Sequence, residues 1–222
     1  MPRRPQHSQC RPDRTPSTVG RAWASRHATF LYPAQTWPHK NHANLLRALA
    51  RLREAKGLEI PLVASGRRNE HFPVLEELSH SLDLTHQVVW TDFVSEADLL
   101  ALYGGATAVV IPTRFEAASA PLWEAFHAGI PAACSNVTSL PEQAGDAALL
   151  FDPDDVPGMA ESIERLWTDA ALRAVLIARG SARVSRLSWD RTARIFRAHY
   201  RRIAGRQLSE QDEALVAPTA GF

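Results

Sequence analysis

From residue 28 onward, hydrophobic positions follow two alternating patterns. Short apolar runs are typical of strands buried on both faces, and they lie at residues 29–32, 62–65, 87–90, 108–111, 132–135 and 148–151. Segments with apolar residues on one helical face separate these runs, and they lie at residues 44–56, 73–82, 95–104, 121–128 and 139–145. This alternation predicts an α/β fold: a single Rossmann-like parallel sheet of about six strands with helices on both faces.

Local signals mark the beginnings of two of these helices. The motif Ser95-x-x-Asp98, a variant of the capping box, opens the third predicted helix. Ser139-x-x-Glu142 opens the fifth helix in the same way. We therefore expect the hydroxyl groups of Ser139 and Thr138 to cap this short helix.

The two ends of the chain lack the alternation. After residue 155 the strand pattern stops, and further helices are predicted at residues 156–168, 170–183 and 189–206. Residues 1–27 are rich in Pro, Arg, Ser and His, and residues 207–222 lose the helical period. Both segments are expected to be disordered, as a basic leader and a tail around one folded domain at residues 28–206. An arginine arm for anionic partners and a transit peptide are alternatives for the leader.

Composition and charge narrow the classes of function. The chain has 222 residues, 45% hydrophobic and 22% charged, with a net charge of +1. These values fit a soluble globular domain and favour neither nucleic acid nor a membrane as partner. No apolar stretch approaches the ~20 residues needed to cross a bilayer. Cys10 in the polar leader and Cys134 in an apolar run are not expected to pair, which is typical of a reducing compartment such as the cytoplasm.

Candidate ligand-binding residues follow the predicted strands at their carboxyl ends, where open parallel sheets bind ligands. Lys40 lies in the loop Y-P-A-Q-T-W-P-H-K-N-H after the first strand and is a candidate cation for a phosphate group. Arg67 and Arg68 follow the second strand and are further candidate cations. Asp92 and Phe93 follow the third strand. The backbone there is a candidate contact for a nucleobase edge, and the phenylalanine ring either lines a base pocket or packs in the core.

Several common kinds of site are disfavoured. His39 and His42 flank the lysine of the first loop, but no third ligand lies at a suitable spacing, so the sequence predicts no metal site. The chain also lacks the P-loop motif, the G-x-S-x-G elbow and the G-x-G-x-x-G fingerprint. Readings as a P-loop enzyme, an α/β-hydrolase or a typical dinucleotide-binding protein therefore lack their motifs.

Glu116 and Glu124 form the strongest candidate site. Glu116 follows the fourth predicted strand, and Glu124 lies just after Ala120, where the next helix begins. A carboxylate accepts two hydrogen bonds from a sugar or ribose diol, while backbone N–H groups at residues 117–120 would face a phosphate at the helix start. A two-carboxylate hydrolase uses the same residue types, but nothing in the local sequence indicates that either glutamate is protonated.

Together these motifs resemble the donor-binding half of the retaining nucleotide-sugar glycosyltransferases known as group 1, which have the GT-B fold. The resemblance covers residues 28–206 and rests on the W-P-H-K-N-H loop, the V-V-W-T-D-F-V run, the two glutamates, and the long motif S-N-V-T-S-L-P-E-Q-A-G-D-A-A-L-L-F-D-P-D-D. The last helix, W-D-R-T-A-R-x-F-R-A-H-Y, is similar to this family's usual ending. The resemblance implies transfer of a hexose from a nucleotide diphosphate sugar to a glycan or lipid-linked acceptor.

The resemblance also implies a role for each site residue. Lys40 matches the lysine on the donor diphosphate, and Glu116 matches the carboxylate that faces the transferred sugar, so both are expected to take part in catalysis. Glu124 matches the carboxylate that holds the ribose hydroxyls. Further donor contacts are expected from Arg67, Asp92 and Phe93 and from the backbone N–H groups of Ala118, Ser119 and Ala120. Neither a metal nor a cofactor is expected, and the implied donor is GDP-mannose or a UDP-sugar.

The chain departs from the family pattern at three points. It reads Glu116-Ala-Ala-Ser119 where many members read E-G-F-G, which restricts the backbone angles of the loop. Gln35 stands where many members carry an arginine. Only a short leader precedes the first strand, so a separate N-terminal domain or subunit is expected to bind the acceptor.

Other functions remain open at this point. The main alternative is a non-catalytic nucleotide-sugar-binding module or a truncated product, and the third is an epimerase or phosphorylase on the same fold. The expected location is the cytoplasm, either free or peripheral to the inner face of the membrane.

Overall fold

The computed structural model describes residues 28–185 and 187–217, and the predictions for residues 1–27 lie outside this range. Its strands are β1 (Thr29–Pro33), β2 (Leu62–Ser65), β3 (Val88–Asp92), β4 (Ala106–Ile111), β5 (Ala132–Ser135) and β6 (Ala148–Phe151). All neighbouring strands pair in parallel, in the order β3-β2-β1-β4-β5-β6. The predicted six-stranded parallel sheet is therefore confirmed.

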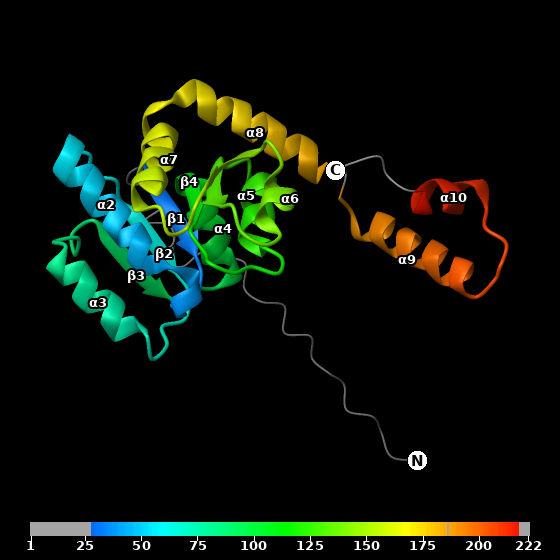
Figure 1. Cartoon of the computed structure of the whole chain (residues 1–222), viewed down its shortest axis with the longest axis horizontal. Coiled ribbons are helices and arrows are strands. Elements are labelled where there is room, and N and C mark those ends of the chain that lie inside the picture. Colours follow the sequence, from blue (N-terminus) through cyan, green and yellow to red (C-terminus); the bar gives the residue numbers. More distant parts are fainter. Residues whose placement is uncertain (1–27, 186, 218–222) are drawn as a thin grey trace, which may run out of the picture.

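Helices follow the strands as the sequence predicts. They are the short 3-10 helix η1 (Pro38–Lys40), α2 (His42–Lys56), α3 (Phe72–Ser81), α4 (Glu96–Gly105), α5 (Ala120–Ala128), α6 (Leu140–Ala144), α7 (Val156–Thr168), α8 (Ala170–Val184), α9 (Trp189–Ile203) and α10 (Glu210–Val216). On one face of the sheet α2 packs against α3 and α7, and on the other α4 packs against α5 (Figure 1). Right-handed crossovers between parallel strands produce this two-sided arrangement.

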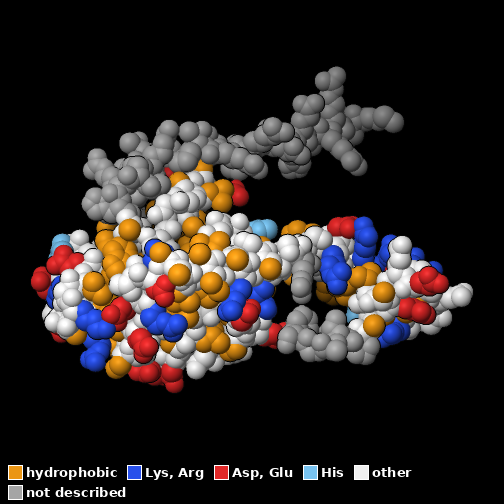
Figure 2. Space-filling view, turned by 90° about the horizontal axis from the view of Figure 1, so that it is seen from above, with side chains coloured by type: hydrophobic (Ala, Val, Ile, Leu, Met, Phe, Trp, Pro, Cys, Tyr) orange, Lys and Arg blue, Asp and Glu red, His pale blue; other side chains and the backbone are white. Residues whose placement is uncertain are grey.

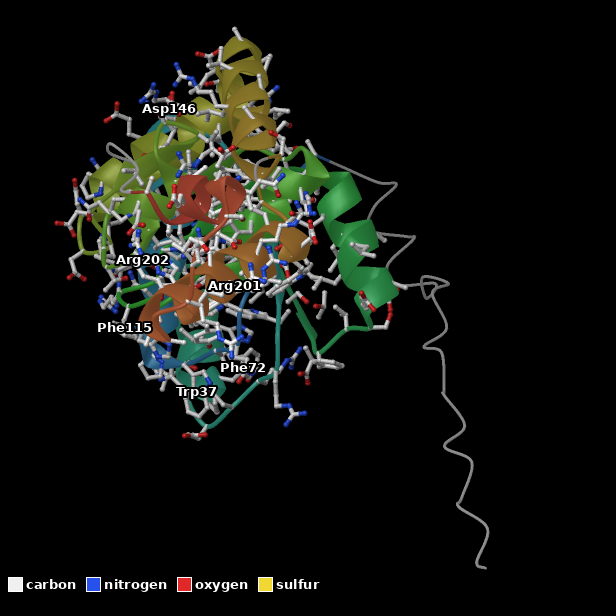
Figure 3. The ribbon with its side chains drawn as sticks, turned by 90° about the vertical axis from the view of Figure 1, so that its right-hand side faces the viewer. Trp37, Phe72, Phe115, Asp146, Arg201 and Arg202 are labelled. Atoms are coloured by element: carbon white, nitrogen blue, oxygen red, sulfur yellow. The ribbon has the colours of Figure 1, made fainter. Side chains whose placement is uncertain are left out.

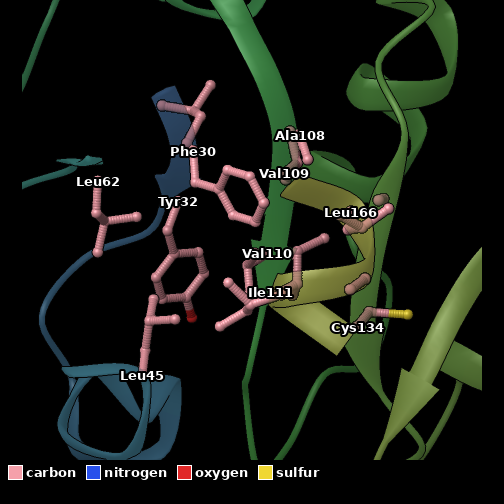
Figure 4. Close-up of a cluster of buried hydrophobic side chains, with 14 of the residues drawn as sticks. Phe30, Tyr32, Leu45, Leu62, Ala108, Val109, Val110, Ile111, Cys134 and Leu166 are labelled. Atoms are coloured by element: carbon pink, nitrogen blue, oxygen red, sulfur yellow. The ribbon is translucent and has the colours of Figure 1, made fainter. Parts of the chain in front are cut away.

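The core lies between these helices and the two central strands. Phe30 and Tyr32 of β1 meet Val109 and Ile111 of β4 in one buried cluster, and Leu45 of α2 reaches it from the helix layer (Figure 4). Burying one such aliphatic or aromatic side chain contributes about 1.5–3 kcal/mol to the stability of the folded state. This packing fixes the positions of β1 and β4, and so it also fixes the points from which the loops after them leave the sheet.

Cys134 lies in the same cluster, on β5. Its thiol is free and fully buried. Burial raises the pKa of this thiol to about 12, so it stays protonated and unreactive while the sheet is intact.

The strand order has a switch point between β1 and β4, where the direction of winding reverses. The chain runs outward from β1 through β2 to β3, then returns to the centre at β4 and runs the other way to β6. The loops after β1 and β4 therefore leave the sheet toward opposite faces. In doubly wound sheets, ligands bind at this switch point, outside the carboxyl ends of the strands.

The C-terminal region differs from its prediction. Helix α9 ends at Ile203 instead of continuing to residue 206, because Gly205 adopts a left-handed backbone with φ of 64°. Within the predicted tail, residues 210–216 form α10, capped by Ser209. Arg197 and Arg201 of α9 bond to its Asp212 at 3.1 and 2.6 Å. This ion-paired contact, the Ser209 cap and the burial of Val216 stabilise the helix.

Helices α9 and α10 form a hairpin that stands apart from the sheet (Figure 1). On α9, large apolar side chains recur at helical spacing and are exposed, and these are Trp189 (89%), Phe196 (56%), Tyr200 (65%) and Ile203 (82%). Figure 2 shows the hairpin as a separate lobe in which blue arginines lie beside orange apolar side chains. Among the helices of the described region, none is both long and apolar enough to cross a membrane.

Candidate functional site

The lysine loop is held in place by buried hydrogen bonds. Helix η1 follows β1, and the hydroxyl of Tyr32 donates to the backbone carbonyl of Lys40 at 2.7 Å. The next residue, Asn41, takes a left-handed backbone with φ of 60°, and its amide donates to the carbonyls of Pro112 and Pro153 at 2.9 and 2.8 Å. These bonds tie the loop after β1 to the segments after β4 and β6. The lysine is therefore presented from a fixed backbone.

Lys40 and Glu116 meet at the carboxyl edge of the sheet, next to the switch point. The lysine Nζ lies 2.6 Å from Glu116 Oε2, and the two side chains are only 20% and 16% exposed. The pair joins residues 76 positions apart, from the loops after β1 and β4. Burial, and then the nearby Glu116 carboxylate, raise the pKa of Tyr32 well above its ordinary value, so that its hydroxyl remains a donor to the loop. The structure thus brings together two residues that the sequence placed at the same sheet edge.

The loop from Glu116 to Ser119 is fastened by side chains that follow β5. Thr138 Oγ1 donates to the Glu116 carbonyl at 2.7 Å and accepts from the Glu116 N–H at 3.2 Å. Ser139 Oγ donates to the same carbonyl at 2.9 Å, and Gln143 Oε1 accepts from the Ser119 N–H at 3.0 Å. The prediction that Ser139 and Thr138 cap α6 is therefore wrong: Ser139, the residue before that helix, makes no capping bond, and both hydroxyls hold the glutamate loop instead.

The N-terminus of α5 opens into this loop. Ser119 precedes the helix, its side chain is fully buried, and its Oγ has no partner among the described residues. The backbone N–H groups of Ala118 and Ala120 form no hydrogen bond with the described part of the chain. Unpaired N–H groups at a helix start, with the positive end of the helix dipole, favour an anion.

Glu124 lies about one turn further along α5 and is exposed. Its Oε2 accepts a hydrogen bond of 2.7 Å from the hydroxyl of Tyr103 in α4. Burial and the bond to Glu124 raise the pKa of Tyr103, so the phenol stays protonated and keeps donating. Tyr103 was not among the candidate residues, because its sequence context is that of an ordinary helix residue.

The two arginines after β2 have different environments. Arg68 donates to the Trp90 carbonyl at 2.8 Å and lies 4.4 Å above the ring centre of Phe72, so its guanidinium is already engaged. Arg67 is exposed and makes no side-chain hydrogen bond or ion pair with the described residues. It is therefore the more available cation of the two.

Gly66 brings the Arg67 loop close to the lysine loop. It has φ of 151°, and a Cβ added there would lie 2.4 Å from the Ala34 carbonyl oxygen. Only glycine allows the loops after β1 and β2 to approach so closely.

The carboxyl end of β3 and the residue that follows it are exposed to solvent. Asp92 takes a left-handed backbone with φ of 60°, and its carboxylate accepts from the Phe93 N–H at 2.7 Å. Phe93 is 75% exposed, so it is not a core residue. Other aromatic residues also border this end of the sheet, and Trp37, Phe72 and Phe115 appear in the same lower part of Figure 3. The ring of Phe93 is thus free to contact a ligand.

The two histidines of the lysine loop, His39 and His42, differ in burial. His42, the first residue of α2, is buried, with its ring centre 4.6 Å from that of Tyr32 and 5.7 Å from that of Trp90. Burial, together with His71 and Lys40, lowers its pKa to about 3. In contrast, His39 is exposed. Across the described region, no three His, Cys, Asp or Glu side chains are grouped so that they could hold a metal ion.

Comparisons with known proteins give the family. Residues 18–183 match the model of the family described as "Glycosyl transferases group 1". The O-antigen chain mannosyltransferase B of Escherichia coli is 36% identical over 160 residues, which cover 72% of this chain and 42% of that protein.

Solved structures share the fold. Sucrose-phosphate synthase from Thermosynechococcus elongatus superposes with a TM-score of 0.71 at 24% identity, covering 86% of this chain and 50% of that one. The C-terminal domain of LpcC, a glycosyl transferase group 1 family protein from Francisella tularensis, superposes with a TM-score of 0.65 at 16% identity, covering 77% and 93%. The chain thus spans 42% of the mannosyltransferase and half of the synthase. Since the family model matches most of its length, the chain belongs to the group 1 glycosyltransferases, with the Rossmann-like fold of one half of a GT-B enzyme.

Proposed function

We propose that this chain binds a nucleotide diphosphate sugar at the switch point between β1 and β4, as the donor-binding half of a retaining hexosyltransferase. The observation that carries the proposal is the Lys40–Glu116 pair, with Glu116 in the loop that leads directly into the N-terminus of α5. A cation and several N–H donors suit a diphosphate, and a carboxylate beside them suits the sugar hydroxyls. Glu124, further along α5, offers an acceptor to the ribose.

In the proposed reaction, the bond between the anomeric carbon and the diphosphate oxygen breaks. The acceptor oxygen bonds to the same face of that carbon, and its proton passes to the leaving diphosphate, so no protein nucleophile is needed. Lys40 and the unpaired N–H groups of Ala118 and Ala120 stabilise the negative charge that builds up on the diphosphate, whereas the Ser119 N–H already donates to Gln143 Oε1. Arg67, Asp92 and Phe93 lie at the same sheet edge, where they would contact the rest of the nucleotide.

The proposed donor is GDP-mannose first and a UDP-sugar second. The bacterial relative with 36% identity is named a mannosyltransferase acting on the O-antigen chain, which supports a mannosyl donor and a glycan or lipid-linked acceptor. The free thiol of Cys134 fits a cytoplasmic location, which we also propose.

We further propose that a separate domain or subunit binds the acceptor. The chain spans only part of the length of its relatives, and the exposed apolar stripe of α9, with Trp189 and Ile203, is a surface of the kind that a protein partner covers. A chain that binds donor without transferring it, a non-catalytic module, is the second candidate on the same grounds. Incubating the purified chain with donor and an oligosaccharide acceptor separates the two, because transfer by the chain alone excludes the non-catalytic module.

Nucleotide binding by the purified chain tests the donor site. We expect calorimetry to detect binding of GDP or UDP, and Lys40→Ala and Glu124→Ala each to weaken it by about tenfold, the effect of losing one charge-assisted contact. Lys56→Ala is the matched control, since Lys56 pairs with Glu164 at the far end of α2, about 20 Å away. Unchanged affinity in both site variants would overturn the site assignment.

A further inference from the structure

Tyr103 donates a hydrogen bond to Glu124, the candidate carboxylate for the ribose. It lies in α4 and is 2% exposed, and its hydroxyl is 2.7 Å from Glu124 Oε2. The Pro121 carbonyl is 3.4 Å from the same hydroxyl and is the weaker of the two acceptors. The bond crosses from α4 to α5 and joins residues 21 positions apart.

The direction of this bond is set by its surroundings. Burial and the neighbouring carboxylate raise the pKa of Tyr103, so the phenol stays protonated and donates its hydrogen bond to Glu124 Oε2. No lysine, arginine or histidine of the described region forms an ion pair with Glu124. The carboxylate is therefore oriented by a neutral hydrogen-bond donor and not by a cation.

An oriented carboxylate has one oxygen to offer a ligand. Glu124 is exposed, and an exposed glutamate without a partner samples several rotamers. The Tyr103 bond holds Oε2, whereas Oε1 accepts no hydrogen bond from the described residues. Oε1 has two lone pairs, enough for the two O–H donors of a vicinal diol.

We propose that Tyr103 is a positioning residue which holds the Glu124 carboxylate in place for the ribose hydroxyls of the nucleotide. This inference rests on the proposed function, since it requires a nucleotide at the switch point. It separates two contributions to donor affinity: the diphosphate is held by Lys40 and the N-terminus of α5, and the sugar ring of the nucleoside by the pair Tyr103–Glu124.

The test compares three probes on wild type and Tyr103→Phe: the ribonucleoside diphosphate (GDP or UDP), its 2′,3′-dideoxy counterpart, and pyrophosphate. Tyr103→Phe keeps the buried ring and removes only the hydroxyl. We expect Kd for the ribonucleotide to rise by about five- to tenfold, as for loss of a hydrogen bond to a charged group, while the other two stay within about twofold. Tyr200→Phe, an exposed tyrosine on α9, is the matched control and should change none of the three.

A double variant shows whether Tyr103 acts through Glu124. In the Glu124→Ala background, adding Tyr103→Phe should leave the ribonucleotide Kd unchanged, because the carboxylate to be positioned is gone. A purely structural tyrosine would weaken all three probes alike and lower the Tm, and that pattern would overturn the inference, as would no change at all. If wild type binds none of the probes, the proposed function fails, and the inference with it, before any variant is compared.

Discussion

At the residue scale, burial controls the protonation of His42, two positions after Lys40. His42 packs against the tilted rings of Tyr32 and Trp90 and is buried, so little water can reach it to solvate an imidazolium. Its pKa of about 3 means that the folded protein holds a neutral imidazole over the whole range in which the unfolded chain becomes charged. The neutral ring packs as an aromatic residue and adds no charge next to the lysine.

A dependence of stability on pH follows from this residue. The unfolded chain protonates His42 near pH 6.5 and the folded protein only near pH 3, so the unfolded state binds more protons between these values. We expect the free energy of unfolding to fall as the pH drops below 6.5, by up to about 1.4 kcal/mol per pH unit from this residue. Urea unfolding of His42→Leu should show a flatter dependence. The exposed His80 supplies the control, His80→Leu, and equal slopes for wild type and His42→Leu would contradict the expectation.

Single residues also show how far the site could be predicted. The proximity of Lys40 to Glu116 could be predicted from the sequence, because the carboxyl ends of parallel strands meet at one edge. The contacts of Tyr103, Thr138 and Gln143 could not, since each finds its partner 21 to 24 positions away and only the strand order brings them together. Their local patterns are those of an ordinary helix residue and of helix caps.

At the scale of structural elements, the glutamate loop after β4 and the segment after β5 are joined by hydrogen bonds. The loop from Glu116 to Ser119 has no glycine, and the segment from Thr138 to Gln143 supplies it with hydrogen bonds at both ends. Thr138 adopts φ of 49°, an unusual backbone for a β-branched residue, which is compatible with folding because these bonds hold it. The loop is therefore shaped by its neighbour instead of by its own glycines.

Removing the Thr138 hydroxyl should loosen this element. Thr138→Val keeps the shape of the side chain but loses both bonds to the Glu116 backbone, so we expect a loss of about 1–2 kcal/mol in the free energy of unfolding. Nucleotide affinity should fall as well, because the N–H groups at the start of α5 lose their fixed position. Thr138→Ser retains the hydroxyl and is the matched comparison. Urea unfolding and calorimetry measure the two effects, and valine and serine variants that behave alike would refute this role.

Element boundaries were predicted closely where the signal is local. The Ser95 cap before α4 is confirmed, since its side chain accepts from the Asp98 N–H at 3.1 Å. The same kind of motif at Ser139 was misread, because the Ser139 hydroxyl donates to the Glu116 carbonyl of the neighbouring loop instead of capping α6. Helix α10 was missed although Ser209-x-x-Asp212 is a start motif of the kind found at Ser95. The arginines that pair with Asp212 lie on another helix, and the local pattern does not show them.

At the scale of the whole molecule, the α9–α10 hairpin is stabilised by ion pairs of its own, separate from the core of the sheet. The Asp212 side chain is fully covered and bonds to two arginines. The hydrogen bond from Arg201, with those from Arg197 and Ser209, lowers the pKa of Asp212 to about 2. The pairing is therefore complete above the carboxyl's ordinary pKa of 3.8 and is lost as the pH falls through 2.

Limited proteolysis should separate the hairpin from the sheet. Asp212→Asn weakens the contact between α9 and α10, so we expect faster trypsin cleavage after Arg201, Arg202 and Arg206, while the Tm of the sheet domain stays unchanged. Asp190→Asn, which removes an exposed partner of Arg194 on the same helix, is the control and should cleave like wild type. A lowered Tm for the sheet domain would show instead that the hairpin supports the sheet.

The pairing of Lys40 with Glu116 has a practical consequence for choosing among donors. Because it joins segments 76 positions apart, its two halves come together only when the central strands β1 and β4 are paired. A ligand held there binds the folded chain alone, and at a hundredfold excess over Kd it stabilises that chain by about 2.7 kcal/mol. For a chain of this size, that corresponds to a rise in melting temperature of roughly 5–10 °C. A panel of nucleotide sugars can therefore be ranked by a dye-based melting assay, with no knowledge of the acceptor.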